Sequence, residues 1–330
     1  MPERKQSKEK KEYDVVVVGD LFCDIATKPL RDYPKRDRQT GCEFFVSLGG
    51  QAGNCAAACA SLGLRTAFFC KCGEDAISAW LLAELRKCGV ECFPSRTAGG
   101  RPGITVSIAF EDGSRSMLTD RGANLDLKAE DLADLNLFTA LRRTKFLMRA
   151  GHWNTEGLFE ANREMLSYAS QHDARTGVDI GWSAFIGWTD FARRSVFEFL
   201  PFVDFLFVNE AEIEALSGKP AGGEGERELL RSGCKNIVVH RGERGSAWFC
   251  RDFEIECEAF EVVPLNPTGA GDVFNAGFIF ALLNGRSPKE CLRFGNATAA
   301  VHLQHRKYPT LTDVLALLER GRDEAVGSDI

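Results

Sequence analysis

The most chemically informative residues lie in one glycine-rich segment near the end of the chain. Thr268-Gly269-Ala270-Gly271-Asp272 leads directly into a run with the periodicity of a helix. The N–H groups in the first turn of a helix have no partner within that helix, and the helix dipole makes this end positive. We therefore predict that the backbone of Gly269, Ala270 and Gly271 binds an anion.

Asp272 would place a carboxylate beside that anion. A carboxylate repels a phosphate, so its position makes chemical sense if it takes a proton from an attacking hydroxyl. The alternative is that Asp272 merely caps the helix, where Asp is common. The chain has no Walker pattern, and Phe274 stands where a dinucleotide-binding fingerprint needs its third glycine. A P-loop NTPase or an NAD-binding half is therefore disfavoured.

A second glycine cluster, Gly49-Gly50-Gln51-Ala52-Gly53-Asn54, precedes an Ala-rich and Cys-rich run. Glycines at a helix start allow a ligand to approach the backbone closely, and Asn54 offers a donor and an acceptor to hydroxyl groups. A tight helix entry would explain the same glycines. Asp20 and Asp24 follow the first predicted strand, where ligands of open α/β sheets bind. An Asp after a strand is also a common turn residue.

A third cluster, Asn209-Glu210-Ala211-Glu212, directly follows another predicted strand. Acidic groups at the carboxyl end of a strand are suited to Mg²⁺, usually with waters between the ion and the protein. Capping of a helix by Asn209, with the acidic residues in its first turn, is the alternative explanation.

The elements that position these clusters alternate between strand and helix patterns. Buried β-branched runs predict strands, and stripes of apolar residues closed by Gly63 and Gly89 predict helices. The predicted strands are 13–18, 146–148, 176–180, 202–208 and 236–240, and the predicted early helices are 52–62 and 74–88. Such alternation predicts an α/β fold with a mainly parallel sheet.

Two stretches interrupt this alternation. Residues 25–48 and 101–119 contain short alternating segments joined by turn signals, with no helical period. We expect them to form a small β-sheet lid inserted into one domain that spans residues 13–330. Residues 1–12 are a run of mixed charge and are expected to be a disordered tail.

Composition limits the possible partners. The 330 residues carry 41 Lys and Arg against 47 Asp and Glu, a net charge of −6, which argues against binding to nucleic acid or anionic membranes. No apolar run approaches a membrane span, and no export signal precedes the first strand. The twelve cysteines include no C-x-x-C pair, so we expect buried thiols in a reduced, cytoplasmic protein.

The order of the motifs resembles the ribokinase, or PfkB, family of carbohydrate kinases. The resemblance extends from about Asp14 to Leu318, and its most specific part is Thr268 to Asp272. The other motifs that carry it are Asp24, Gly49 to Asn54, Gly73-Glu74-Asp75, Gly122-Ala123-Asn124, Asn209 to Glu212 and Arg241 to Gly245. It implies a Rossmann-type α/β domain with a β-sheet lid, ATP as donor, Mg²⁺, and transfer of the γ-phosphoryl group to a sugar-type hydroxyl.

The resemblance also implies a role for each matching residue. Asp272 would be the general base, and Gly269, Ala270 and Gly271 would form the anion hole. The residues expected to face the sugar are Asp24, Gly50, Gln51 and Asn54. Glu212 would hold Mg²⁺, through water, together with Asn209. The residues expected along the nucleotide are Asn209, His240, Gly242, Thr268 and Asn296.

Several positions depart from the family pattern and leave the acceptor open. Asn266 replaces an Asp that many relatives use near a monovalent cation, so K⁺ activation is undecided. Residues 178–182 lack the Asp-x-Asn-x-Arg pattern of ketodeoxygluconate kinases and some fructokinases, which disfavours those substrates. Gln51 stands where ribokinases usually have Lys. Phe22 replaces an Asn that contacts ribose in many ribokinases; with Trp153 and Trp182 it could stack on a base.

Three functions therefore stay open: a sugar kinase, a nucleoside kinase of the same family, and a catalytically silent relative that senses a ligand. The intact Gly-Ala-Gly-Asp sequence disfavours the last. We also expect a homodimer formed through an exposed lid sheet.

Overall fold

The computed structural model describes residues 10–265, 268–305 and 307–327. In this part of the chain a nine-stranded sheet has the order β13-β12-β11-β10-β9-β8-β1-β4-β5. Its strands are β1 (Tyr13–Val18), β4 (Thr66–Gly73), β5 (Glu91–Thr97), β8 (Thr144–Ala150), β9 (Arg175–Asp179), β10 (Phe205–Asn209), β11 (Asn236–His240), β12 (Ser246–Cys250) and β13 (Glu254–Cys257). All neighbours from β5 to β11 are parallel, and β12 and β13 add an antiparallel edge.

The parallel part of the sheet is covered on both faces. Val15 to Val18 of β1 are fully buried, and they alternate between two apolar clusters on opposite faces. A strand buried on both faces reads as a continuous apolar run, which is why the four valines stand together.

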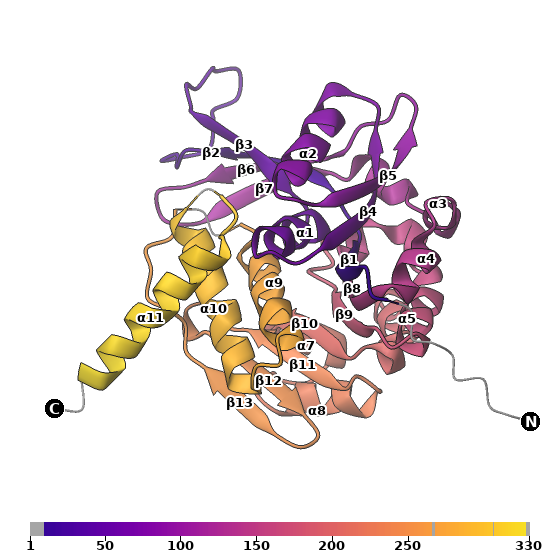
Figure 1. Cartoon of the computed structure of the whole chain (residues 1–330). Coiled ribbons are helices and arrows are strands. Elements are labelled where there is room, and N and C mark those ends of the chain that lie inside the picture. The colour runs from indigo at the N-terminus through magenta and orange to yellow at the C-terminus, as the bar shows by residue number, and fades with distance from the viewer. Residues whose placement is uncertain (1–9, 266–267, 306, 328–330) are drawn as a thin grey trace, which may run out of the picture.

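One face carries α1 (Gln51–Ser61), α2 (Ala76–Lys87), α9 (Ala270–Leu283), α10 (Pro288–Gln304) and α11 (Leu311–Gly327). The other carries α3 (Ala129–Asp134), α4 (Leu137–Arg142), α5 (Ala161–Gln171), α6 (Asp190–Phe197), α7 (Glu210–Ser217) and α8 (Glu224–Arg231). Figure 1 shows α1, α9 and α10 side by side in front of the sheet.

The lid is a separate four-stranded sheet of order β3-β2-β6-β7. Its strands are β2 (Phe22–Thr27), β3 (Phe44–Gly49), β6 (Gly103–Ala109) and β7 (Arg115–Asp120), and it stands to one side of the main sheet (Figure 1). Both predicted lid segments thus contribute. β2 begins before the predicted boundary, however, so Asp24 lies within a lid strand and not in a turn after β1.

Two further expectations need correction. Strand β10 starts at Phe205 because Leu200–Phe202, which contains Pro201, forms a 3₁₀ turn. The sequence patterns do not predict β4, β5, β12 or β13. The end of the predicted tail is ordered: Lys11 Nζ donates to the carbonyls of Arg142 at 3.2 Å and His172 at 2.8 Å.

The twelve cysteines are all free, seven of them buried and none exposed, as the thiol interpretation predicts. No helix in the described ranges is long and apolar enough to cross a membrane.

Candidate active site

The candidate site lies at the carboxyl ends of adjacent strands. Asn209 of β10 and His240 of β11 are register partners, and Asp179 ends the neighbouring strand β9. Helices α1 and α9 begin at the same edge. A parallel sheet aligns the carboxyl ends of its strands, so residues far apart in sequence gather there.

The predicted anion turn has the expected geometry. Gly269 is left-handed, with φ of 81°, and stands directly before α9, so the first N–H groups of that helix are unpaired within it. A Cβ on Gly269 would lie 3.0 Å from Nδ2 of Asn54, and one on Gly271 would lie 3.3 Å from Nδ1 of His240. Both glycines therefore allow other groups to approach the turn closely.

Asp272 is the third residue of α9 and makes no capping hydrogen bond. Its Oδ2 instead accepts a hydrogen bond from Asn54 Nδ2 at 2.9 Å. Its side chain is 8% exposed, and burial, followed by the nearby charge of Asp179, raises the pKa of Asp272 well above its usual range. The helix-cap explanation is therefore wrong for this carboxylate, and a raised pKa suits a general base.

Asn54 is held from both sides. Its Nδ2 binds Asp272, and its Oδ1 accepts a hydrogen bond from the Tyr308 hydroxyl at 2.7 Å. The amide thus orients Asp272, a role that adds to its predicted contact with hydroxyl groups. Sequence reasoning missed Tyr308, and a single tyrosine after a helix gives no pattern by which to find it.

Gln51 and His240 are joined through two residues that were not among the predicted site residues. Gln51 Nε2 donates to Asp179 Oδ1 at 2.9 Å, and Asn275 Nδ2 donates to Asp179 Oδ2 at 2.7 Å. Asn275 Oδ1 then meets His240 Nε2 at 2.9 Å. The available signal was weak: Asp179 ends a predicted strand, and Asn275 follows Asp272 by three residues on the same helix.

The lid cavity has a volume of about 1040 Å³ and lies between the lid and the helices α1 and α2. Asp24, Asn54 and Thr268 line it, together with Phe45 of β3 and Tyr308. The Asp24 carboxylate packs on Gly49, where a Cβ would be 2.2 Å from Cγ. Gly50, with φ of 88°, lies beside it.

Burial, followed by the charge of Asp20, raises the pKa of Asp24 to about 7. Asp24 has no hydrogen-bond partner among the described residues. Asp20 differs, because it accepts hydrogen bonds from the backbone of Ala52 and from Asn154 Nδ2, and so fixes the start of α1. Of the two acidic candidates, only Asp24 faces the cavity.

Asn209 and Glu212 form a capping box at the start of α7, as the capping explanation predicted. Glu212 Oε2 accepts from the Asn209 N–H at 2.9 Å, and burial, followed by the charge of Asp179, raises the pKa of Glu212 to about 8. Its other oxygen, Oε1, has no hydrogen-bond partner in the described ranges. No group of three His, Cys, Asp or Glu side chains among the described residues could hold a metal.

The other residues predicted to lie along the nucleotide have different environments in the structure. Arg115 of the lid donates to Thr268 Oγ1 at 3.3 Å, and Gly242 lies in the turn after β11. Asn296 of α10 is 6% exposed, and its Nδ2 donates to the carbonyls of Cys257 and Glu258. Its amide nitrogen thus anchors the end of β13. Asn266 lies outside the described residues.

The proposed aromatic stack is not assembled. Phe22 and Trp153 are each 3% exposed, and Trp153 Nε1 donates to the Gly181 carbonyl. Both rings therefore belong to the core, and only Trp182 is exposed.

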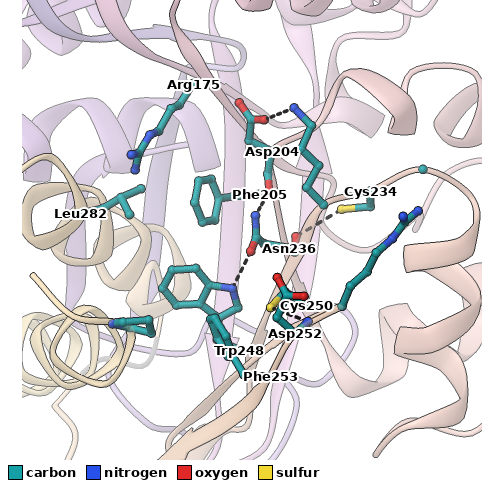
Figure 2. A pocket seen from close by; sticks show the side chains of 14 residues that line it. Arg175, Asp204, Phe205, Cys234, Asn236, Trp248, Cys250, Asp252, Phe253 and Leu282 are labelled. Atoms are coloured by element: carbon teal, nitrogen blue, oxygen red, sulfur yellow. Dashed lines mark hydrogen bonds and ion pairs between the residues drawn. The ribbon is translucent and has the colours of Figure 1, made fainter. Parts of the chain in front are cut away.

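A second cavity, of about 820 Å³, lies at the amino ends of β9, β10 and β11 (Figure 2). Four of its polar side chains pair with one another: Lys235 Nζ with Asp204 Oδ1 at 2.6 Å, and Trp248 Nε1 with Asn236 Oδ1 at 2.9 Å. Because ligands of open α/β sheets bind at the carboxyl ends of the strands, we place the chemistry in the lid cavity.

A mainly parallel α/β sheet with a lid, a glycine turn that exposes helix N–H groups and a buried carboxylate is the arrangement expected of a small-molecule kinase. The family model described as "pfkB family carbohydrate kinase" matches residues 13–310. The chain belongs to the PfkB family of carbohydrate kinases, and it is a phosphotransferase with an alcohol group as acceptor.

Curated relatives that are named for different acceptors resemble the chain. A 5-dehydro-2-deoxygluconokinase of Bacillus velezensis is 24% identical over 94% of this chain and 96% of its own length. A ribokinase of Arabidopsis thaliana is 27% identical over 92% of this chain and 80% of its own length.

Solved structures agree on the fold. An Arabidopsis thaliana ribokinase complexed with ribose and ATP has a TM-score of 0.80 at 26% identity, and covers 93% of this chain and 98% of its own. An adenosine kinase of Sinorhizobium meliloti has a TM-score of 0.78 at 26% identity, over 94% of this chain and 99% of its own.

Proposed function

We propose that the protein transfers the γ-phosphoryl group of ATP to a hydroxyl of a small carbohydrate bound in the lid cavity. The observation that carries this proposal is the contact between the predicted acceptor and catalytic residues: Asn54 binds Asp272 at the anion turn, while Asp24 lines the adjoining cavity. An acceptor held by Asp24 would present its hydroxyl to Asp272, and the N–H groups of residues 269–271 would stabilise the transferred phosphoryl group.

Mg²⁺ would neutralise the phosphates of ATP. Glu212 fits such a role, because its buried carboxylate has one oxygen outside the capping box and lies near the charge of Asp179. Since no three-residue metal cluster exists among the described residues, the ion would be held largely by phosphate oxygens and water, as Mg²⁺ commonly is.

The identity of the preferred acceptor decides between a sugar kinase, a nucleoside kinase and a catalytically silent relative. ADP release should be measured with a panel of pentoses, hexoses, sugar acids and nucleosides, each with and without K⁺. A sugar or sugar acid as the preferred acceptor supports the proposal, and a nucleoside establishes the nucleoside kinase instead. ATP binding without turnover of any acceptor would indicate the silent, ligand-sensing relative.

The acidic limb of the kcat/KM profile should lie at a pH above the usual pKa range of carboxyl groups. Asp272 must be unprotonated to accept a proton, and its pKa is raised; the pKa of Asp24 is raised to about 7. We therefore expect kcat/KM to rise with pH through the neutral range and to fall as either carboxylate is protonated. Initial rates from pH 5 to 9 at constant ionic strength test this, and a flat profile below pH 6 would contradict it.

The lid offers a surface for a second copy of the chain. Phe44, Val46, Met117 and Leu118 of the lid are 60, 55, 50 and 66% exposed. Since burying such side chains in an interface is favourable, we predict a homodimer formed through the lid. Sedimentation velocity should show a dimer that Leu118→Glu dissociates, and a monomer at all working concentrations would refute the prediction.

A further inference from the structure

A chain of hydrogen bonds, Gln51–Asp179–Asn275–His240, crosses the candidate site near Asp272. Its centre is Asp179, which is 5% exposed and accepts hydrogen bonds from three donors. Gln51 Nε2 and the Gly181 N–H reach Oδ1 at 2.9 and 3.1 Å, and Asn275 Nδ2 reaches Oδ2 at 2.7 Å. The donors come from the start of α1, the segment after β9, and α9.

This arrangement determines which ring nitrogen of His240 carries the proton. Because Asn275 gives its N–H to the Asp179 carboxylate, it presents its oxygen to His240 Nε2. That nitrogen must then carry the proton. Burial lowers the pKa of His240 to about 4, so the ring is neutral and Nδ1 keeps a lone pair. Nδ1 lies on the side of Gly271 in the anion turn.

A carboxylate in this place is hard to explain by packing. Burying a charge is costly, and an apolar side chain would fill the same volume without that cost. The position makes sense if the charge is needed to orient its donors. One of these donors, Gln51, is predicted to face the acceptor. The chain of hydrogen bonds ends at His240, which is predicted to face the nucleotide.

We propose that Asp179 is a positioning residue that joins the acceptor side of the site, through Gln51, to the nucleotide side, through Asn275 and His240. This inference rests on the proposed kinase function for its kinetic consequences. The orientation of Asn275 and the tautomer of His240 do not depend on which acceptor is phosphorylated.

Asp179 also acts on the proposed base through its charge. The titratable groups whose charges act on Asp272 are Asp179, Asp20 and Asp24, and each raises its pKa, whereas the hydrogen bond from Asn54 lowers it. Cys55 and Tyr308 are also close to Asp272, and both have raised pKa values and are neutral. Burial raises the pKa of Asp179 itself to about 6, so its charge acts on Asp272 above that pH. Removing this charge therefore moves the acidic limb of the pH profile to lower pH.

The first test is Asp179→Asn, which keeps the shape of the side chain and removes its charge. KM should rise about 10-fold or more for both ATP and the acceptor, in line with the loss of hydrogen bonds to a charged group. The acidic limb of kcat/KM should shift to lower pH. Unchanged KM values and an unchanged acidic limb in a folded variant would overturn the proposal.

Asp204→Asn is a matched control at the far edge of the sheet. Asp204 also accepts bonds from other elements, including Lys235 Nζ at 2.6 Å and the Thr176 N–H at 2.9 Å. Its loss should lower stability comparably and leave both KM values and the pH profile at wild-type values. If Asp204→Asn reproduced the kinetic changes of Asp179→Asn, the effect would be structural and the proposal would fail.

Two further variants test the two halves of the hydrogen-bond chain separately, one at Gln51 and one at Asn275. Gln51→Met should raise KM for the acceptor with little effect on KM for ATP, and Asn275→Leu should do the opposite. These variants keep the Asp179 carboxylate and provide a test if Asp179→Asn does not fold. Wild-type KM values in both would contradict the positioning role.

A spectroscopic measurement is independent of turnover. The ¹⁵N shifts of the His240 ring should show Nε2–H in the wild type and lose that preference in Asp179→Asn. The chain has five histidines, so the signal is assigned by its loss in His240→Gln. An unchanged tautomer in Asp179→Asn would overturn the inference. Failure of every acceptor would refute the proposed function but leave this readout intact.

Discussion

Replacing Asp272 by Asn is expected to lower kcat on the order of 10²- to 10⁴-fold, the usual effect of removing a general base. The amide cannot accept a proton from the acceptor hydroxyl, but it preserves the shape of the side chain and can still accept a hydrogen bond from Asn54. KM for ATP should change little, since the N–H groups of residues 269–271 are untouched. Steady-state rates with the preferred acceptor, together with ATP titrations by calorimetry, separate these two quantities.

Asp313 provides the matched control. Like Asp272 it is the third residue of a helix, but its Oδ2 accepts hydrogen bonds from the backbone and the hydroxyl of Thr310. It is thus a true capping residue. Asp313→Asn should lower thermal stability slightly and leave kcat unchanged. Equal kcat values in Asp272→Asn and the wild type would show that Asp272 is not the base.

Removal of the Asp24 carboxylate should lower kcat/KM for the acceptor about 10- to 100-fold, as expected when a hydrogen bond to a charged group is lost. Asp24 lines the lid cavity without a hydrogen-bond partner among the described residues, so under the proposed function an acceptor hydroxyl would donate to it. Asp24→Ala should therefore raise KM for the acceptor and leave KM for ATP near the wild-type value. Measuring both KM values for the same preparation tests the assignment.

Gly49→Ala gives an independent test of the same carboxylate. The added Cβ would lie within 2.4 Å of Cγ and both carboxylate oxygens of Asp24, so the side chain must move. KM for the acceptor should rise in this variant as well. Gly41→Ala is a control in the exposed segment between β2 and β3, where a Cβ would meet no atom within 4 Å. If Gly49→Ala and Asp24→Ala both left acceptor binding intact, the acceptor would have to bind elsewhere.

The sequence by itself determined the class of fold and the local motifs. The run Val15 to Val18 has no polar face, and four adjacent β-branched residues favour a strand covered on both sides. The glycine turn before Asp272 exposes helix N–H groups wherever that helix lies. Such properties depend on neighbours within a few residues. They were therefore readable without a structure, as was the presence of a lid in the two stretches that lack helical periodicity.

The tertiary structure decided which polar groups meet. Asn54 and Asp272 are 218 residues apart, and Gln51 and Asp179 are 128 residues apart, yet both pairs are in hydrogen-bond contact. The same structure showed that Asp20 supports a helix while Asp24 faces the cavity, and that Phe22 is buried. Contacts of this kind depend on strand order and register, which no local pattern encodes. The network through Asp179 could be found only after the strands had been placed side by side.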